Sequence, residues 1–203
     1  MPPGFIQLLY RTSHPDGAKL VAHRCLGATG YTGARQAGLF LKEAADRCGK
    51  PIYLELSGIN PVFILPGALA ERGAAIVDEF VSSALLGAGQ FCTNPGLVVL
   101  RAGSTTDEFI AAVAARFEQT PPGTLLSAGV EQHLHAGIVA LQQAGATLVA
   151  GGRPVEAGRC CHANTLLRAS AAQLLDNPHG LQQEAFGNCS LLIVADSDDE
   201  LTT

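Results

Sequence analysis

The chain has 203 residues, of which 47% are hydrophobic and 15% charged. This balance excludes a disordered chain and supplies apolar side chains for one large domain or two small ones. The net charge of −5 argues against nucleic-acid binding, because no basic stripe is available to neutralise phosphates. The first residues do not resemble a signal peptide, and the six cysteines contain no CxxC pair. We therefore expect a reducing, cytoplasmic setting.

The first part of the chain predicts a strand–helix–strand unit of the kind that builds parallel sheets. Apolar residues within Arg35–Cys48 recur at i, i+3, i+4 and i+7, and Gly49 supplies a C-cap, so this segment predicts an amphipathic helix. Its flanking strands are expected at Cys25–Tyr31 and Pro51–Leu56. Before them the sequence predicts a strand at Phe5–Tyr10, a turn at His14–Gly17 and one or two helical turns at Ala18–His23.

The rest of the chain predicts further helices and short strands, and so an α/β fold. A helix over Leu69–Leu86 leads to a glycine-rich turn and a core strand at Gly96–Leu100. Thr105 and Glu108 form a candidate capping box for the next helix. That helix would bury Phe109, Ile110, Val113 and Phe117, and a later one Val130, Leu134, Ile138 and Leu141; the other expected elements are an apolar run at Val62–Leu65 and strands at Thr147–Ala150 and Leu191–Ala195.

The segment Leu86–Leu100, LGAGQFCTNPGLVVL, places Cys92 in a setting without charged residues. Gly, Pro, Asn, Gln and Thr interrupt the segment too often for a membrane helix. The glycines and Pro95 allow a strained turn, and such turns often hold reactive groups. On composition alone, Cys92 is either a nucleophile or a small buried apolar residue.

Two earlier segments also contain residues that could bind a ligand or take part in catalysis. Gly30–Ala34, followed by Gly38, lies where a strand passes into a helix, and the N–H groups of a helix N-terminus attract phosphate. Many α/β turns are equally rich in glycine, so an ordinary turn is the alternative. Glu55 lies at the end of an expected strand, and a carboxylate beside a thiol can activate water or accept the thiol proton. The pattern alone favours an ordinary strand-end carboxylate.

Cysteine and histidine residues later in the chain do not predict a metal site. Cys160 and Cys161 precede His162, but sequence neighbours point to opposite faces of a strand and rarely converge on one ion. His133 and His135 are two residues apart in an expected helix, so they face different directions. We expect both to be surface or packing residues.

Four segments, in this order along the chain, together resemble the aldehyde dehydrogenase superfamily. They are Gly30–Ala34, similar to the Gly-Phe-Thr-Gly-Ser turn; Glu55–Gly58, similar to Glu-Leu-Gly-Gly; Gly89–Gly96, similar to the nucleophilic cysteine loop; and Glu184–Gly187, similar to Glu-x-Phe-Gly-Pro. On its own, the last segment is equally consistent with a helix end that buries a phenylalanine. The run Ile59–Leu69 is most similar to the α-ketoglutaric semialdehyde (2,5-dioxovalerate) dehydrogenase branch.

Three residues depart from these motifs. Tyr31 replaces a phenylalanine, Ala34 replaces a serine whose hydroxyl helps hold phosphate, and Asn188 replaces the usual proline. Backbone donors remain at Ala34, so we expect weaker cofactor binding rather than none. Without the proline ring at position 188, we expect a less rigid loop.

The resemblance implies a three-layer aldehyde dehydrogenase-like fold. Residues 1–56 would form the C-terminal part of a Rossmann-like dinucleotide-binding domain, and residues 57–203 a C-terminally incomplete catalytic domain. The chain therefore resembles an internal fragment of the family. By this resemblance it would lack the segment that selects NAD or NADP and the asparagine that gives a second oxyanion donor. For the full-length protein the resemblance implies a homo-oligomer.

The activity that the resemblance implies is the NAD(P)-dependent oxidation of an aldehyde to a carboxylic acid, with 2,5-dioxovalerate as the first candidate. Cys92 would attack the aldehyde and Glu55 would activate the water that releases the acid. NAD or NADP would be bound by Thr32, Gly33, Ala34, Gly38, Leu56, Glu184 and Phe186. No metal, nucleic acid or membrane is implied.

Three alternatives stay open at this point. The chain is a truncated, inactive product of the family, or a fatty or aliphatic aldehyde dehydrogenase. A thiol hydrolase is disfavoured, because no histidine follows a nucleophile-elbow pattern. We expect the isolated 203-residue chain to have little activity and to self-associate.

Overall fold

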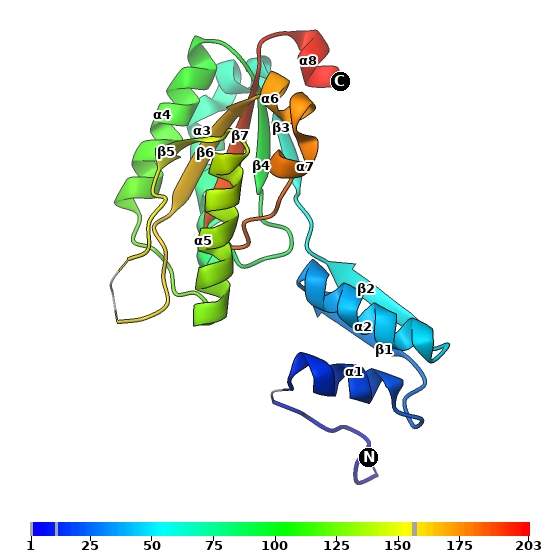
Figure 1. The fold of residues 1–203 in the computed structure, drawn as a ribbon. Coiled ribbons are helices and arrows are strands. Elements are labelled where there is room, and N and C mark those ends of the chain that lie inside the picture. The colour runs from blue at the N-terminus through cyan, green and yellow to red at the C-terminus, as the bar shows by residue number, and fades with distance from the viewer. Residues whose placement is uncertain (1, 11, 156–157) are drawn as a thin grey trace. The chain divides into compact units, whose positions relative to one another are not determined.

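The computed structural model describes residues 2–10, 12–155 and 158–203. The chain forms two compact units, Met1–Ser57 and Gly58–Thr203, here called the N-terminal and C-terminal units. Each is described by itself (Figure 1). Among the described residues, no helix combines the length and the hydropathy needed to cross a membrane.

The N-terminal unit confirms the predicted strand–helix–strand arrangement. Its elements are α1 (His14–Ala22), β1 (Thr29–Gly33), α2 (Arg35–Arg47) and β2 (Ile52–Leu56). β1 and β2 pair in parallel, with Thr29 opposite Ile52 and Gly33 opposite Leu56. Val21 of α1 packs with Ala44 and Ala45 of α2 in a small core. The carboxyl ends of both strands therefore lie side by side at one edge.

Three predictions for the N-terminal unit are wrong. Phe5–Tyr10 forms no strand, because β1 and β2 pair only with each other and leave this segment no neighbour. The expected turn at His14–Gly17 is the first turn of α1, which Ser13 caps by accepting a hydrogen bond from the Asp16 N–H at 3.2 Å. β1 starts four residues later than the expected strand at Cys25–Tyr31, at Thr29.

The C-terminal unit is built on a five-stranded sheet with the order β3-β4-β7-β6-β5. The first four strands in this order run parallel, and β5 runs antiparallel to β6. The strands are β3 (Pro61–Ile64), β4 (Leu97–Arg101), β5 (Thr147–Ala150), β6 (Thr165–Ser170) and β7 (Cys189–Ala195). The helices are α3 (Pro66–Leu85), η1 (Leu86–Gly89), α4 (Ser104–Gln119), α5 (Ala128–Gln143), α6 (Ala171–Asp176), α7 (Pro178–Leu181) and α8 (Asp198–Thr202).

Helices cover both faces of this sheet (Figure 1). Successive residues of a strand point to opposite faces. Accordingly, Val98 and Leu100 of β4 pack with residues of α3 and α4, whereas Leu97 and Val99 pack with residues of α5 and α7. β7 is buried along its whole length, as expected for a central strand. The unit thus has the three layers that the resemblance implied.

Helix α4 agrees with the sequence in its buried face but not in its cap. Phe109, Ile110, Val113 and Phe117 are buried as predicted. The capping box of Thr105 and Glu108 is wrong, because α4 starts at Ser104 and its N-cap residue, Gly103, has no side chain to donate or accept. Strand β6 and helices α6, α7 and α8 were not predicted.

Candidate active site

The chain that follows α3 enters a tight left-handed turn before Cys92. Gly87, Ala88 and Gly89 have φ values of 56°, 58° and 67°, a region that costs free energy for any residue with a Cβ atom. Ala88 is held there because it is buried in the core below the turn. Strained backbone of this kind persists only where the surrounding structure determines it. The turn ends with the exposed thiol of Cys92.

Three amide side chains hold the turn that carries Cys92. Asn60, just before β3, donates from Nδ2 to the carbonyl of Cys92 at 2.6 Å and to that of Asn94 at 3.1 Å. Gln90 donates from Nε2 to the carbonyl of Gly87 at 2.9 Å, and its Oε1 accepts from the Leu126 N–H at 2.8 Å. Asn94 donates to the Gly89 carbonyl at 3.0 Å. The turn is thus fixed on both sides of the thiol.

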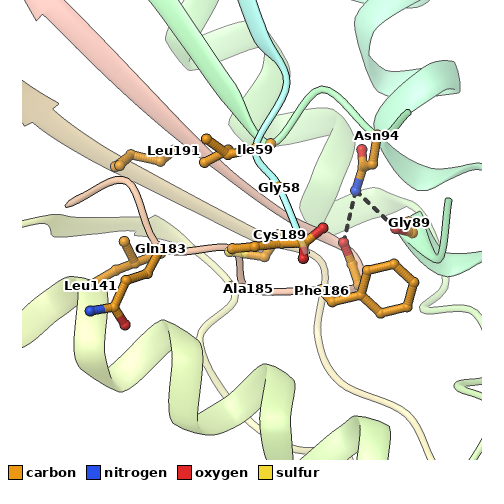
Figure 2. A pocket seen from close by; sticks show the side chains of 13 residues that line it. Gly58, Ile59, Gly89, Asn94, Leu141, Gln183, Ala185, Phe186, Cys189 and Leu191 are labelled. Atoms are coloured by element: carbon orange, nitrogen blue, oxygen red, sulfur yellow. Dashed lines mark hydrogen bonds between the residues drawn. The ribbon is translucent and has the colours of Figure 1, made fainter. Parts of the chain in front are cut away.

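The Glu184–Gly187 segment lies against this turn. A Cβ atom on Gly89 would overlap the Gly187 carbonyl and lie 2.8 Å from the Asn188 nitrogen. Asn94 also donates from Nδ2 to the Gly187 carbonyl at 2.9 Å, and Figure 2 shows both of its hydrogen bonds. The structure therefore brings together the segments of three predicted site residues, Cys92, Glu184 and Phe186.

A small hollow lies between this segment and the start of the sheet (Figure 2). It is lined by Gly58, Ile59, Gly89, Asn94, Gly96, Leu141, Gln183, Glu184, Ala185, Phe186, Gly187, Cys189 and Leu191. Phe186 is 37% exposed at this hollow. Burial raises the pKa of the Cys189 thiol to about 12, so Cys189 stays protonated and unreactive.

Asn188, at the position of the family's proline, is fully buried and bonded to the neighbouring strand. Its Nδ2 donates to Asn164 Oδ1 at 2.7 Å and to the His162 carbonyl at 2.8 Å, and its carbonyl accepts from the Thr165 N–H at 2.8 Å. Asn164 in turn donates to the carbonyls of Phe117 and Thr120. We expected a less rigid loop at position 188, where the proline ring is missing. In the structure, the hydrogen bonds of Asn188 hold the loop at this position.

The remaining predicted site residues belong to the N-terminal unit and gather at one edge of its sheet. Thr32 is the register partner of Glu55, and Gly33 that of Leu56. Glu55 and Thr32 are exposed. Ala34 follows as the N-cap of α2 and provides no side-chain hydrogen bond, while the Ser57 hydroxyl accepts from the Arg35 N–H at 3.3 Å. The N-cap residue of α2 thus supplies no cap of its own, and Ser57 occupies the N–H of Arg35 only.

Gly38 has a packing role in this unit. It is buried in α2, and a Cβ atom there would overlap the side chain of Leu56 and lie 3.0 Å from the ring of Tyr31. The missing side chain therefore lets α2 lie close to the two strands. Its role in cofactor binding stays a prediction.

The residues around the vicinal cysteines differ in burial: Cys160 and His135 are half-buried, whereas His133 is exposed. Cys161 and His162 are buried, and His135 Nδ1 lies 3.4 Å from His162 Nε2. Burial is the main cause that lowers the pKa of His162, and His135 lowers it further, whereas the Ala163 carbonyl and Glu131 act in the opposite direction. Among residues 2–10, 12–155 and 158–203, no three His, Cys, Asp or Glu side chains form a group that could hold a metal ion.

Sequence reasoning missed the roles of Asn60, Gln90 and Asn94. A signal was present, because uncharged amide side chains flank the cysteine on both sides in a stretch otherwise made of small and apolar residues. Amides are the side chains that can both donate to and accept from the backbone of an irregular turn.

Curated relatives match nearly the whole chain. It is 37% identical over 207 residues to the α-ketoglutaric semialdehyde dehydrogenase 2 of Azospirillum brasilense, with 99% of this chain and 38% of the relative covered. It is 33% identical over 205 residues to the α-ketoglutaric semialdehyde dehydrogenase of Acinetobacter baylyi, with 100% and 38% covered. The chain thus spans 38% of the length of these relatives.

A solved structure shares the fold. The betaine aldehyde dehydrogenase of Staphylococcus aureus, in complex with NAD+, matches 91% of this chain and 38% of its own with a TM-score of 0.76 and 21% identity. The model of the aldehyde dehydrogenase family matches residues 1–203. The chain belongs to the aldehyde dehydrogenase family.

Proposed function

We propose that the protein takes part in the NAD(P)-dependent oxidation of an aldehyde to a carboxylic acid, with Cys92 as the nucleophile. The observation that carries the proposal is the exposed thiol of Cys92 in a turn that three amide side chains hold. An exposed cysteine in a constrained turn is available to a substrate, whereas Cys161 and Cys189 are buried. Family membership supports the same chemistry.

The proposed chemistry assigns one step to each of two residues. Cys92 Sγ attacks the aldehyde carbon and forms a thiohemiacetal, and the Cys92 N–H stabilises the negative oxygen. Loss of a hydride from that carbon leaves a thioester on Cys92. Glu55 then removes a proton from the water that hydrolyses the thioester, which releases the acid and regenerates the thiol.

The described residues fit a nicotinamide dinucleotide, which when bound supplies a hydride acceptor. Thr32, Gly33 and Ala34 are exposed immediately before α2, whose N-cap residue makes no side-chain hydrogen bond. Ser57 occupies the N–H of Arg35, and the next N–H groups of this first turn can face a phosphate. In the C-terminal unit, Glu184 and Phe186 line the hollow beside the cysteine turn. We assign cofactor contacts to these residues, with Gly38 and Leu56 packed beneath the turn. The choice between NAD and NADP is left to the assay.

We further propose that the substrate is a semialdehyde with a carboxylate, first 2,5-dioxovalerate, which is oxidised to 2-oxoglutarate. The support is the identity with two α-ketoglutaric semialdehyde dehydrogenases and a lower identity, 30% over 200 residues, with the N-succinylglutamate 5-semialdehyde dehydrogenase of Escherichia coli. Cytoplasmic location and a homo-oligomer of the full-length protein stay predictions.

The test measures NAD(P)H formation by the 203-residue chain and by the longest protein that its coding region specifies. The substrates are 2,5-dioxovalerate, N-succinylglutamate 5-semialdehyde and a long aliphatic aldehyde, each with NAD and with NADP. We expect the longer protein to prefer 2,5-dioxovalerate, and Cys92→Ser to lower its rate at least about a thousandfold.

Cys48→Ser is the matched control, because it removes a different exposed thiol, which belongs to the N-terminal unit. It should leave the rate within about twofold of wild type. A folded Cys92→Ser variant that oxidises aldehydes at the wild-type rate contradicts the role of Cys92. A preference for the aliphatic aldehyde contradicts the substrate assignment alone.

A further inference from the structure

We propose that Asn94 is a positioning residue that sets the spacing between the Cys92 turn and the Glu184–Gly187 segment. The proposal rests on the proposed function, since it concerns two segments assigned to the same reaction. Asn94 Nδ2 donates to the carbonyl of Gly89 at 3.0 Å and to that of Gly187 at 2.9 Å (Figure 2). One amide therefore joins residues that are almost a hundred positions apart in the chain.

The orientation of this amide is determined by its surroundings. Both Gly89 and Gly187 offer carbonyl oxygens, so only the NH2 group can face them. The other end of the amide, Asn94 Oδ1, is buried and has no hydrogen-bond partner among the described residues. A reversed amide would bring three oxygens together. The side chain is thus committed to its two donor contacts.

The backbones at Gly89 and Gly187 are also in direct contact. A Cβ atom on Gly89 would overlap the Gly187 carbonyl, so the segments already lie at van der Waals distance. Asn94 itself is fixed, because its N–H donates to the Phe91 carbonyl at 3.1 Å and its carbonyl accepts from the Gly96 N–H at 2.8 Å. The amide therefore transmits the position of one segment to the other.

Removal of the two donors should separate the segments without unfolding the sheet. In Asn94→Asp, a carboxylate oxygen takes the place of the NH2 group. This oxygen faces the carbonyl oxygens of Gly89 and Gly187, which repel it. The Cys92 turn keeps its contacts with Asn60 and Gln90. We therefore expect the Glu184–Gly187 segment to lose its place while the thiol keeps its own.

The first experiment is hydrogen exchange of the full 203-residue chain, followed by mass spectrometry. In Asn94→Asp, amides in peptides over 183–189 should exchange about tenfold faster than in wild type, while those of α4 keep the wild-type rate. Asn177→Asp is the matched control, because Asn177 Oδ1 accepts from the Gly180 N–H and an aspartate keeps that oxygen. It should leave all of these rates unchanged.

A second variant keeps the proposal testable if Asn94→Asp does not fold. Asn94→Ser retains one shorter donor, and it should give an intermediate rate over 183–189. Wild-type exchange of this segment in the folded variants overturns the proposal. So does an equal increase throughout the C-terminal unit, since that would show general destabilisation.

The second experiment separates positioning from reactivity in a protein that oxidises aldehydes. Asn94→Asp should raise the KM for the nicotinamide cofactor about tenfold, while alkylation of Cys92 by iodoacetamide changes by less than about threefold. An unchanged cofactor KM overturns the proposal. If the wild-type protein oxidises no aldehyde, the proposed function fails, and the exchange experiment still decides the role of Asn94.

Discussion

The two units hold their candidate site residues by different means. Among its described residues the N-terminal unit buries three apolar side chains, Val21, Ala44 and Ala45, whereas buried clusters lie on both faces of the C-terminal sheet. The cysteine turn consequently belongs to a unit with many buried apolar side chains, and the turn at Thr32–Ala34 to a unit with few. Burial of apolar area is the main source of stability, so we expect the N-terminal unit to unfold more readily.

The hydrogen bonds around the two turns differ in the same way. Side-chain amides of Asn60, Gln90 and Asn94 fix the turn of the C-terminal unit at several carbonyls. In the N-terminal unit the Tyr31 hydroxyl donates to the Ala34 carbonyl at 3.3 Å, and Ser57 accepts from Arg35. The turn that carries Cys92, the proposed nucleophile, is therefore held by more side-chain hydrogen bonds than the proposed phosphate turn.

Alkylation of the cysteines gives the largest expected contrast. Cys92 should react first and Cys25 and Cys48, the exposed thiols of the N-terminal unit, should follow. Cys189 should react about a thousandfold more slowly than an exposed thiol, because burial raises its pKa from 9.0 to about 12 and a tenfold loss of thiolate accompanies each pKa unit. Limiting iodoacetamide and peptide mass spectrometry measure the order. Labelling of Cys48 before Cys92 would contradict the special role of the turn.

Substitution of a glycine by alanine should lower the free energy of unfolding more in the C-terminal unit than in the N-terminal unit. Gly89→Ala should destabilise the C-terminal unit by about 3 kcal/mol or more, because the new Cβ overlaps the Gly187 carbonyl at a φ of 67°. Gly49→Ala is the control in the N-terminal unit, with a φ of 62° but no atom within 4 Å of the new Cβ. It should cost only about 1 kcal/mol. Urea unfolding measures both, and equal losses would show that backbone strain alone acts at Gly89.

Truncation of one core residue in each unit tests the difference between the cores. Leu192→Ala, at a fully buried site in the central strand, should lower the free energy of unfolding of the C-terminal unit by about 3 kcal/mol. Val21→Ala should lower that of the N-terminal unit by about 1–2 kcal/mol. Hydrogen exchange reports each unit separately. A single transition in which both variants destabilise the whole chain would show that the units do not unfold independently.

The smallest expected effect is a pH dependence that arises in the C-terminal unit. Burial lowers the pKa of His162 below 6.5, so the unfolded chain binds the proton more readily than the folded one. The stability of this unit should therefore fall as the pH drops through and below 6.5. His162→Gln should flatten this dependence, whereas His133→Gln, at an exposed histidine, should preserve it. An unchanged slope in His162→Gln would assign the effect to other groups.

Long helices and continuously apolar strands could be predicted from the sequence. Elements whose formation depends on a partner distant in the chain could not. Helices α2, α3, α4 and α5 follow from their apolar spacing, and β4 and β7 from their continuous apolar residues. Phe5–Tyr10 has strand-like composition but no strand beside it. β6 was missed because Arg168 interrupts its apolar run, and only its place between β5 and β7 makes it a strand.

The candidate site shows the same division. The motifs located Cys92, Glu184 and Phe186, and the structure brings their segments together in the C-terminal unit. The contacts of Asn60 and Asn94 could not be predicted, since a hydrogen bond from a side chain to a remote carbonyl depends on the final packing of both segments. The chemical roles of Glu55 and Cys92 stay predictions until the assays are made.

The pairing of β3 with β4 has a consequence for how this part of the chain can change in length. Asn60 directly precedes β3, and Pro61 is the register partner of Leu97, so the amide reaches the Cys92 carbonyl only in this register. Insertion of one residue between Asn60 and Pro61 would shift the amide by about 3.3 Å and reverse its face. Alignments of related chains should therefore show substitutions but no gaps between this asparagine and the strand that follows it.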